Sequence, residues 1–461
     1  MSLNKINLKN NWKLLLIIFL AICSFAIFGL GTEPLNRDSG QFIAIADNLL
    51  TQGKFSADGQ NLTSVREPGY PLFLTAVFEI FGDHNYLAVN IIQFILFLSL
   101  IIYFYCLCRR IFPNKNWPLW VVGAAAFFPS FNFYNSQILS ESLFTFFLGG
   151  SALLLIDLTV NKFYNRGKIF LLGAFLGLAA LVRVEGLIAA AVIIITLLIL
   201  KYFKSALIIL GIFLVLICPW MLRNYYHFGN FSLTNGRQEV QFIADATLIS
   251  RARLADYPRV SWVRIKKGFR LPLTKKDIDL EFSYNENDIM WRTDAVQKFF
   301  VAHPDEAPRN QALAKNDPID AYGQEGGPGR LATRYCEKII LQHPVTAMTD
   351  MFFNTVGTLG PELPTVIKDN NFFQHKILAK AFSVLYALLY LAIYAGLFLL
   401  LLKIIPLHRQ NYPLYILIII AMGVLAGHSI FSFTTRFNTP LFIIYFILLA
   451  YYFGLPKKND I

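Results

Sequence analysis

The sequence contains about ten apolar segments that are each long enough to cross the hydrocarbon core of a bilayer. This feature limits the fold more than any other, because a spanning helix needs about 20 predominantly apolar residues. Hydrophobic residues make up 56% of the 461-residue chain and charged residues only 15%, which is far from the usage of a soluble domain. Backbone polar groups find no water inside lipid, so each segment is expected to be helical.

We therefore predict an all-α polytopic membrane protein with about ten transmembrane helices. The segments from Ile169 to Val182 and from Leu187 to Leu200 are short and lie close together, so counts from eight to twelve fit the pattern. The first segment is long and lacks a small-residue cleavage site, and we expect it to be a retained helix. The ten segments begin near Leu14, Tyr86, Trp117, Leu139, Ile169, Leu187, Ser205, Ile377, Tyr412 and Pro440.

Lys and Arg residues in short loops indicate the orientation, because cytoplasmic loops carry an excess of them. With ten spans, all basic clusters fall on one side, so we expect both termini in the cytoplasm of a bacterium and the chain in its inner membrane. The formal net charge of +12 follows from this topology, since residues 223–375 hold 19 of the 41 basic and 18 of the 29 acidic residues. No nucleic-acid partner is expected. The clusters are Lys5, Lys9 and Lys13; Arg109, Arg110 and Lys115; Lys162, Arg166 and Lys168; Lys201 and Lys204; Lys403 and Arg409; Lys457 and Lys458.

The chain divides into three predicted parts. Residues 1–222 form a transmembrane core that includes the first outer loop, 33–83; residues 223–375 form a mostly helical insert on the outer face; residues 376–461 hold the last three spans. Within the loop, residues 39–50 show a helical apolar stripe typical of a helix that lies on the membrane surface, with Asp38 and Ser39 as candidate N-caps. Residues 70–81 are too few to cross the bilayer and are expected to enter only the interface. Helical patterning in the insert covers residues 287–301 and 331–356.

Ionisable residues concentrate at the predicted outer ends of spans and in outer loops. Transporters usually place such groups near the bilayer midplane, whereas here only Asp157, near a cytoplasmic end, comes close. The chain also lacks a phosphate-binding loop of the Gly-Lys-Ser/Thr type, which argues against an ATP-driven exporter. The pattern favours an enzyme that works at the outer surface. Its candidate site residues are Arg37, Asp38, Arg66, Glu67, Glu141, Arg183, Glu185, Arg223 and Arg436.

Several short motifs resemble the GT-C membrane glycosyltransferases, in particular the branch of protein O-mannosyltransferases and lipid A aminoarabinose transferases. Asp38-Ser39-Gly40-Gln41 followed by Arg66-Glu67-Pro68-Gly69-Tyr70-Pro71 is similar to the first outer loop of that superfamily. Further motifs similar in order and position are Leu139-Ser140-Glu141-Ser142-Leu143, Leu181-Val182-Arg183-Val184-Glu185-Gly186, Pro219-Trp220-Met221-Leu222-Arg223-Asn224 and Thr435-Arg436-Phe437-Asn438-Thr439-Pro440. The resemblance implies a GT-C fold.

The resemblance also implies an inverting transfer of a sugar from a polyprenyl-phosphate donor to a glycolipid, polysaccharide or protein acceptor on the outer face. An acceptor hydroxyl needs a base that removes its proton, and Asp38 is the candidate. The leaving polyprenyl phosphate is a stable anion that needs no protonating acid, unlike the leaving group of a glycosidase. It does need positive charge nearby. Arg183, Arg223 and Arg436 come from three separated segments and suit phosphate contact.

The remaining candidates have less defined roles. Glu141 is expected to be a second carboxylate that orients the acceptor, a metal or the loop. Glu67 matches a position that helps to hold a metal in the aminoarabinose branch, so a divalent cation is the one cofactor that the resemblance suggests. Arg37, Arg66 and Glu185 are further candidates for substrate binding.

Each assignment has a structural alternative. Asp38 could cap the loop helix, which would stabilise that helix by about 1 kcal/mol. Glu141 lies in the first turn of a span, where a carboxylate suits the helix dipole. Arg183 and Glu185 could pair across a tight turn, and Arg223 and Arg436 could anchor their spans at the lipid headgroups.

Two other functions also fit the sequence. A transporter or flippase for lipid-linked saccharides would use the outer charges only to bind headgroups, and a related ligase or polymerase would move whole oligosaccharides. The third and fourth segments are rich in Phe and could either line a groove for the polyprenyl chain or pack as ordinary core. These residues are Phe127, Phe128, Phe131, Phe133, Phe144, Phe146 and Phe147.

Overall fold

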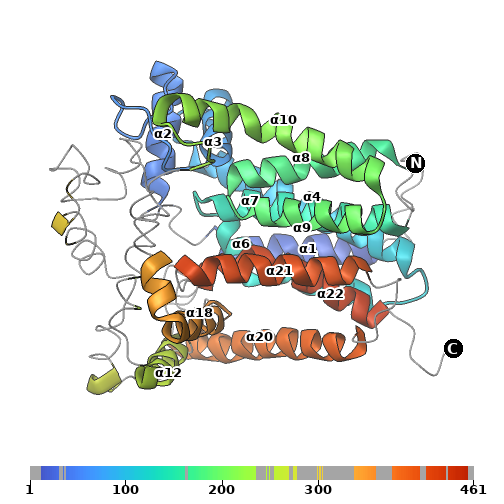
Figure 1. Cartoon of the computed structure of the whole chain (residues 1–461). Coiled ribbons are helices and arrows are strands. Elements are labelled where there is room, and N and C mark those ends of the chain that lie inside the picture. The colour runs from blue at the N-terminus through green and yellow to red at the C-terminus, as the bar shows by residue number, and fades with distance from the viewer. Residues whose placement is uncertain are drawn as a thin grey trace.

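The chain forms a bundle of helices, and every regular element that the structure describes is helical. The long helices run side by side, whereas α2 (Ser39–Gln52) lies across their ends (Figure 1). The predicted all-α architecture is therefore confirmed for the described residues. The computed structural model describes residues 12–30, 38–160, 165–234, 254–268, 274–277, 337–359, 376–404, 412–431 and 435–454, with single positions at 35, 246, 249, 298, 301, 302 and 304.

The first part of the chain supplies most of the bundle. α8 packs against both α7 and α10, and α3 packs against α2, α4 and α8. Besides α2, the helices of this part are α1 (Trp12–Phe28), α3 (Gly69–Phe81), α4 (Tyr86–Ile111), α5 (Trp117–Phe127), α6 (Pro129–Asn135), α7 (Ser140–Val160), α8 (Arg166–Val182), α9 (Gly186–Ile199) and α10 (Phe203–Phe228).

The later part of the chain adds helices that pack on the first part. α22 contacts α5, α21 contacts α9, and the 3₁₀ helix η6 lies against α7. The predicted insert helix at 331–356 coincides with helical residues 337–342 and with α18, whereas most of the one predicted at 287–301 lies outside the described residues. The elements are η2 (Leu254–Asp256), α12 (Tyr257–Gly268), α18 (Pro344–Thr358), α20 (Lys376–Ile404), α21 (Tyr412–Phe431), η6 (Thr435–Leu441) and α22 (Phe442–Gly454).

All ten predicted apolar segments contain a helix, and four described helices are long and apolar enough to cross a membrane. These four are α4, α7, α10 and residues Val384–Leu402 of α20, and six further helices are apolar but shorter. The chain is thus an integral multi-pass membrane protein. The two debatable segments form α8 and α9, which are joined by a short turn at Arg183 and Glu185.

The third predicted span is not one continuous helix. It breaks between α5 and α6 at Phe128, because Pro129 has no N–H and excludes the helical conformation at the residue before it. The break frees carbonyl groups that water cannot reach, and side chains satisfy them. Asn132 Nδ2 donates to the carbonyls of Ala126 (3.1 Å) and Phe128 (3.4 Å) and to Ser24 Oγ (2.9 Å). The tenth predicted span likewise begins with a 3₁₀ helix, η6, before α22.

An aromatic cluster joins the last helices to this break. The ring of Phe128 lies 4.7 Å from that of Phe442 and 5.3 Å from that of Phe446, and Tyr386 and Tyr390 of α20 pack on it as well. Among the Phe residues of the third and fourth segments, Phe128, Phe131, Phe133 and Phe144 are buried. The packing alternative therefore describes these four side chains.

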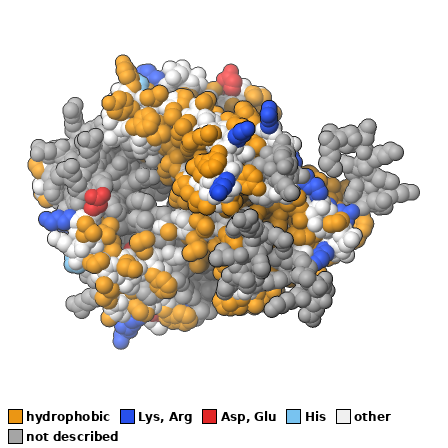
Figure 2. Space-filling view, turned by 45° about the vertical axis from the view of Figure 1, so that its right-hand side comes forward, with side chains coloured by type: hydrophobic (Ala, Val, Ile, Leu, Met, Phe, Trp, Pro, Cys, Tyr) orange, Lys and Arg blue, Asp and Glu red, His pale blue; other side chains and the backbone are white. Residues whose placement is uncertain are grey.

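The end of the bundle opposite α2 is basic. Asp157 is buried there and is paired with Arg110 and Lys168, while the Tyr103 hydroxyl donates to it at 2.8 Å. Lys13, at the start of α1, donates to Asn116 in the turn before α5, so the first helix begins at this same end. Figure 2 brings this end forward and shows Lys and Arg side chains among apolar ones. That this end faces the cytoplasm stays a prediction.

The helix break gives a test of how the fold is held. Replacing Asn132 with Leu keeps the volume but removes the side-chain donor of the buried Ala126 carbonyl, and a buried polar group left without a partner costs about 1–3 kcal/mol. We expect Asn132→Leu to lower the melting temperature of the purified protein in detergent.

Ser151→Ala is the matched control, since Ser151 Oγ donates to Phe147 O within the intact helix α7 and that carbonyl keeps its helical partner. Equal melting temperatures for the two variants would show that Asn132 is not what holds the break.

Candidate active site

The start of α2 carries an ion pair between two residues of the predicted site. Arg66 Nη2 lies 2.9 Å from Asp38 Oδ1, and Arg66 Nε donates to Gln41 Oε1 at 2.7 Å. The guanidinium also lies over the ring of Phe42, 4.6 Å from its centre. Arg66 is buried, whereas the Asp38 side chain is 23% exposed. The pair therefore fixes a carboxylate that a molecule outside the protein can reach.

The capping alternative for Asp38 is wrong. Asp38 precedes α2 with φ −74° and ψ −24°, and its side chain makes no cap hydrogen bond to the helix. Its carboxylate turns to Arg66 instead, since a charged partner gives a stronger hydrogen bond than a backbone N–H.

Arg183 holds two carboxylates together at the same end of the bundle. Its Nη1 lies 3.2 Å from Glu141 Oε1 in the first turn of α7, and its Nη2 lies 3.1 Å from Glu185 Oε1 in the turn before α9. Nη1 also donates a hydrogen bond to Ser140 Oγ at 3.3 Å. The predicted pairing of Arg183 with Glu185 is present, and Glu141 is added to it. The Glu141 side chain is 1% exposed, so this is a buried network.

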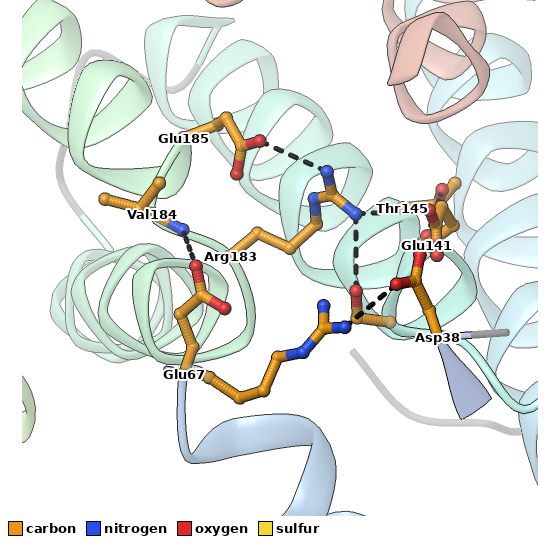
Figure 3. A network of polar contacts seen from close by, with 9 residues as sticks. Asp38, Glu67, Glu141, Thr145, Arg183, Val184 and Glu185 are labelled. Atoms are coloured by element: carbon orange, nitrogen blue, oxygen red, sulfur yellow. Dashed lines mark hydrogen bonds and ion pairs between the residues drawn. The ribbon is translucent and has the colours of Figure 1, made fainter. Parts of the chain in front are cut away.

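Glu67 ties the first outer loop to this network. Its Oε1 accepts a hydrogen bond from the backbone N–H of Val184 at 3.1 Å (Figure 3). Burial, together with the nearby Glu185 carboxylate, raises the pKa of Glu67 above its usual value. The Arg66-Glu67 pair thus contacts α2 through one residue and the α8–α9 turn through the next.

Gly69, the glycine of the loop motif, stands where a larger side chain would clash with α8. A Cβ on Gly69 would meet the carbonyl oxygen of Leu181 at 2.8 Å and the side chain of Val182 at 2.8 Å. Only glycine lets α3 begin this close to the end of α8. The close approach explains why Glu67 can reach Val184.

A buried polar network beside Glu141 was not predicted from the sequence. The Tyr70 hydroxyl donates to Gln93 Oε1 at 3.1 Å, and Gln93 Nε2 donates to the carbonyls of Asn135 and Gln137, both at 3.0 Å. These bonds satisfy the connection between α6 and α7, which is buried throughout. The available signal was a lone Gln in the middle of the apolar helix α4, because an amide inside a span needs partners.

Arg223 belongs to a separate set of contacts at the end of α10. Its Nη1 donates to the carbonyl of Thr63 and to Asn224 Oδ1, both at 2.8 Å. The rings of Trp220, Phe55 and Phe228 pack around the guanidinium. Its Nη2 is buried and has no hydrogen-bond partner. Arg223 thus holds the first outer loop and still has a donor to offer.

The other predicted positions are placed only in part. Arg37 and the side chain of Arg436 lie outside the described residues, although the backbone of Arg436 is within η6. In the described ranges, no group of three His, Cys, Asp or Glu residues could hold a metal ion. That Glu67 helps to hold a divalent cation stays a prediction.

A segment in the first half of the sequence matches a known family. Residues 65–222, about a third of the chain, match the model described as dolichyl-phosphate-mannose-protein mannosyltransferase. The resemblance to the GT-C glycosyltransferases is confirmed. The matched segment includes Arg66, Glu67, Glu141, Arg183 and Glu185, whereas Asp38 lies before it. No curated protein matches the sequence.

Three solved structures are similar over nearly the whole chain at low identity. ArnT from Cupriavidus metallidurans in the apo state is 14% identical, with 97% of this chain and 78% of ArnT covered and a TM-score of 0.40. The same protein bound to undecaprenyl phosphate is 14% identical, with 96% of this chain and 77% of ArnT covered and a TM-score of 0.36. The third is the archaeal oligosaccharyltransferase AglB from Archaeoglobus fulgidus, in complex with an inhibitory peptide and a dolichol-phosphate. It is 13% identical, with 96% of this chain and 50% of AglB covered and a TM-score of 0.46. The chain therefore spans half the length of AglB.

The Arg183 network should dominate the stability of this end. Removing one partner of a buried ion pair costs about 3–5 kcal/mol, so we expect Arg183→Gln to lower the melting temperature markedly. The double variant with Glu141→Gln should recover part of the loss, because the orphaned charge is then removed. Arg166→Gln, an exposed Arg at the start of α8, is the control. Unfolding of the first two variants at the temperature of this control would contradict the buried pairing.

The raised pKa of Glu67 predicts a pH dependence. Between the usual value of 4.5 and the folded-state pKa, the folded protein holds a proton that the unfolded chain has released, so stability falls as pH rises. Glu67→Gln keeps an acceptor for Val184 and does not titrate. We expect similar melting temperatures for variant and wild type at the acid end of this window and a more stable variant above it. A constant difference across pH would contradict the shift.

Proposed function

We propose that the protein transfers a sugar from a polyprenyl-phosphate donor to an acceptor on the outer face of the membrane, with inversion at the anomeric carbon. The observation that carries the proposal is the Asp38 carboxylate. It is partly exposed at one end of a membrane bundle and is held by buried Arg66. The family match over residues 65–222 supports glycosyl transfer as the reaction class.

Asp38 acts as the base in this proposal. The acceptor oxygen attacks the anomeric carbon while its proton passes to Asp38, and the bond from that carbon to the phosphate oxygen breaks. The polyprenyl phosphate leaves with the electron pair as an anion. Attack from the face opposite the leaving group inverts the configuration. The Arg66 contact to Asp38 Oδ1 orients the carboxylate.

The arginines divide into two roles. Arg183 is a positioning residue for Glu141, since both of its terminal nitrogens already contact carboxylates. Arg223 has an unpaired buried donor, and with Arg436 and Arg37 it would stabilise the phosphate as charge develops on it. Glu141, Glu185 and Glu67 fix the frame around this centre, and no step of the mechanism uses a metal ion.

The finer assignments follow from the same proposal. The acceptor is a glycolipid, polysaccharide or protein, and the membrane is the inner membrane of a bacterium, with the site on the periplasmic side and both termini in the cytoplasm. ArnT is solved with undecaprenyl phosphate, and AglB is solved with an inhibitory peptide and a dolichol-phosphate. Moving a whole oligosaccharide in place of a single sugar would use the same atoms, so a ligase or polymerase is a variant of this function.

A transporter or flippase is the alternative from another class. It would need ionisable groups along a path through the bundle. Asp157, the buried acid nearest to such a path, is paired with Arg110 and Lys168 at the basic end. Sugar transfer in proteoliposomes without translocation of the lipid-linked saccharide would exclude this alternative.

The proposal predicts the behaviour of Asp38→Asn. A general base contributes about 10²- to 10⁴-fold to rate, so the purified variant should consume a polyprenyl-phosphate sugar at least about 100-fold more slowly than wild type. Turnover is measured by mass spectrometry of the lipid donor.

Asp47→Asn is the matched control for this experiment. Asp47 lies on the same helix, is partly exposed, and pairs with His84 away from Arg66. It should keep wild-type turnover. Wild-type turnover in Asp38→Asn would remove Asp38 from the mechanism, and equal losses in both variants would point to a general disturbance of α2.

A further inference from the structure

A chain of hydrogen bonds links the outer insert to the segment that carries Arg436. The Tyr445 hydroxyl donates to Asn438 Oδ1 at 3.0 Å, Asn438 Nδ2 donates to the Tyr394 hydroxyl at 2.8 Å, and Tyr394 donates to the carbonyl of Leu359 at 2.8 Å. In each of these hydrogen bonds, the donor is on the Tyr445 side and the acceptor is on the Leu359 side. Each bond therefore depends on the orientation set by the one before it.

The four residues come from four different elements. Tyr445 is on α22 and Tyr394 is on the spanning part of α20, while Asn438 is in η6 and Leu359 directly follows α18. Asn438 and Tyr445 are buried. η6 itself packs on α7, α18 and α22. These hydrogen bonds thus connect the last transmembrane helices to the insert through η6, the segment in which Arg436 lies.

Burying the polar groups of this hydrogen-bond chain costs desolvation free energy, and packing alone gives no reason for it. Buried hydroxyl and amide groups lose their hydration, and they are tolerated only when every partner is present. Apolar residues of similar volume would satisfy the same packing without this requirement. A fully connected chain specifies one arrangement of the elements that it joins.

We propose that Tyr394 is a positioning residue that couples α18 of the insert to η6, and so places the Arg436 segment for the donor phosphate. The inference rests on the proposed function for its effect on the donor, but the mechanical link stands on the hydrogen bonds alone. Movement of α18 on acceptor binding would reach η6 through the Tyr394 hydroxyl. Binding of the acceptor at α18 and of the donor phosphate at η6 would then be coupled through the Tyr394 hydroxyl.

Tyr394→Phe tests the link, because it removes only the hydroxyl. Tyr386→Phe is the matched control, since Tyr386 is two turns earlier on α20 and its hydroxyl pairs with Ser130 of α6. Tyr445→Phe breaks the chain at its other end. All three variants keep their rings, so the aromatic packing of α20 and α22 is retained.

Hydrogen–deuterium exchange of the full-length protein in nanodiscs gives the first readout. We expect exchange in residues 344–359 and 435–441 to rise about 2- to 10-fold in Tyr394→Phe, the range that losing one or two hydrogen bonds allows. Tyr445→Phe should raise exchange more in 435–441 than in 344–359, because it breaks the chain of hydrogen bonds on the η6 side and leaves the Tyr394–Leu359 bond in place. Unchanged exchange in Tyr394→Phe, or an equal rise in Tyr386→Phe, would overturn the link.

Steady-state kinetics give the second readout. In Tyr394→Phe, the KM for the polyprenyl-phosphate sugar should rise about 2- to 10-fold with kcat little changed. A merely structural role would lower the active fraction and so kcat, with KM unchanged, and that result would overturn the positioning role. A wild-type protein without transfer would overturn the proposed function alone, and the exchange pattern would still decide whether Tyr394 joins α18 to η6.

Discussion

The contact of Arg183 with two carboxylates is the interaction on which the α2 end of the bundle depends. It joins the start of α7, through Glu141, to the turn between α8 and α9, through Glu185. The first outer loop then reaches the same turn through Glu67 and Val184. A buried charge must be paired, because its desolvation costs several kcal/mol. The geometry of the loop that holds Asp38 is consequently fixed by a network that lies deeper than Asp38 itself.

The same requirement shapes the interior of the bundle. The break between α5 and α6 is tolerated because Ser24 Oγ donates to the carbonyl of Phe127 and Asn132 Nδ2 donates to the carbonyl of Ala126. Gln93 does the same for the turn that leads to Glu141. Irregular backbone at membrane depth survives only where protein groups satisfy it. This is why the α6–α7 connection is both buried and close to the candidate site.

The two ends of α7 show how charge is divided along the protein. Glu141 and Asp157 are separated by 16 positions of one helix, or about 24 Å at 1.5 Å per residue. Glu141 contacts Arg183 at one end, and Asp157 contacts Arg110 and Lys168 at the other. The helix between them is almost entirely buried and carries no further ionisable group. The two charged clusters therefore lie at opposite ends of α7, and the proposed chemistry uses only the one around Glu141.

The sequence by itself determined the helical membrane architecture and its apolar segments, because hydrophobic length is a property of composition and order. The Asp-Arg-Glu motifs pointed to the family for the same reason, as local patterns. Only the tertiary structure decided which charges meet. Asp38 turned from a candidate cap into the partner of Arg66, Arg183 became the link between Glu141 and Glu185, and Tyr394 joined η6 to α18. These contacts connect residues far apart in the chain, and helix periodicity carries no information about which distant helix ends pack together.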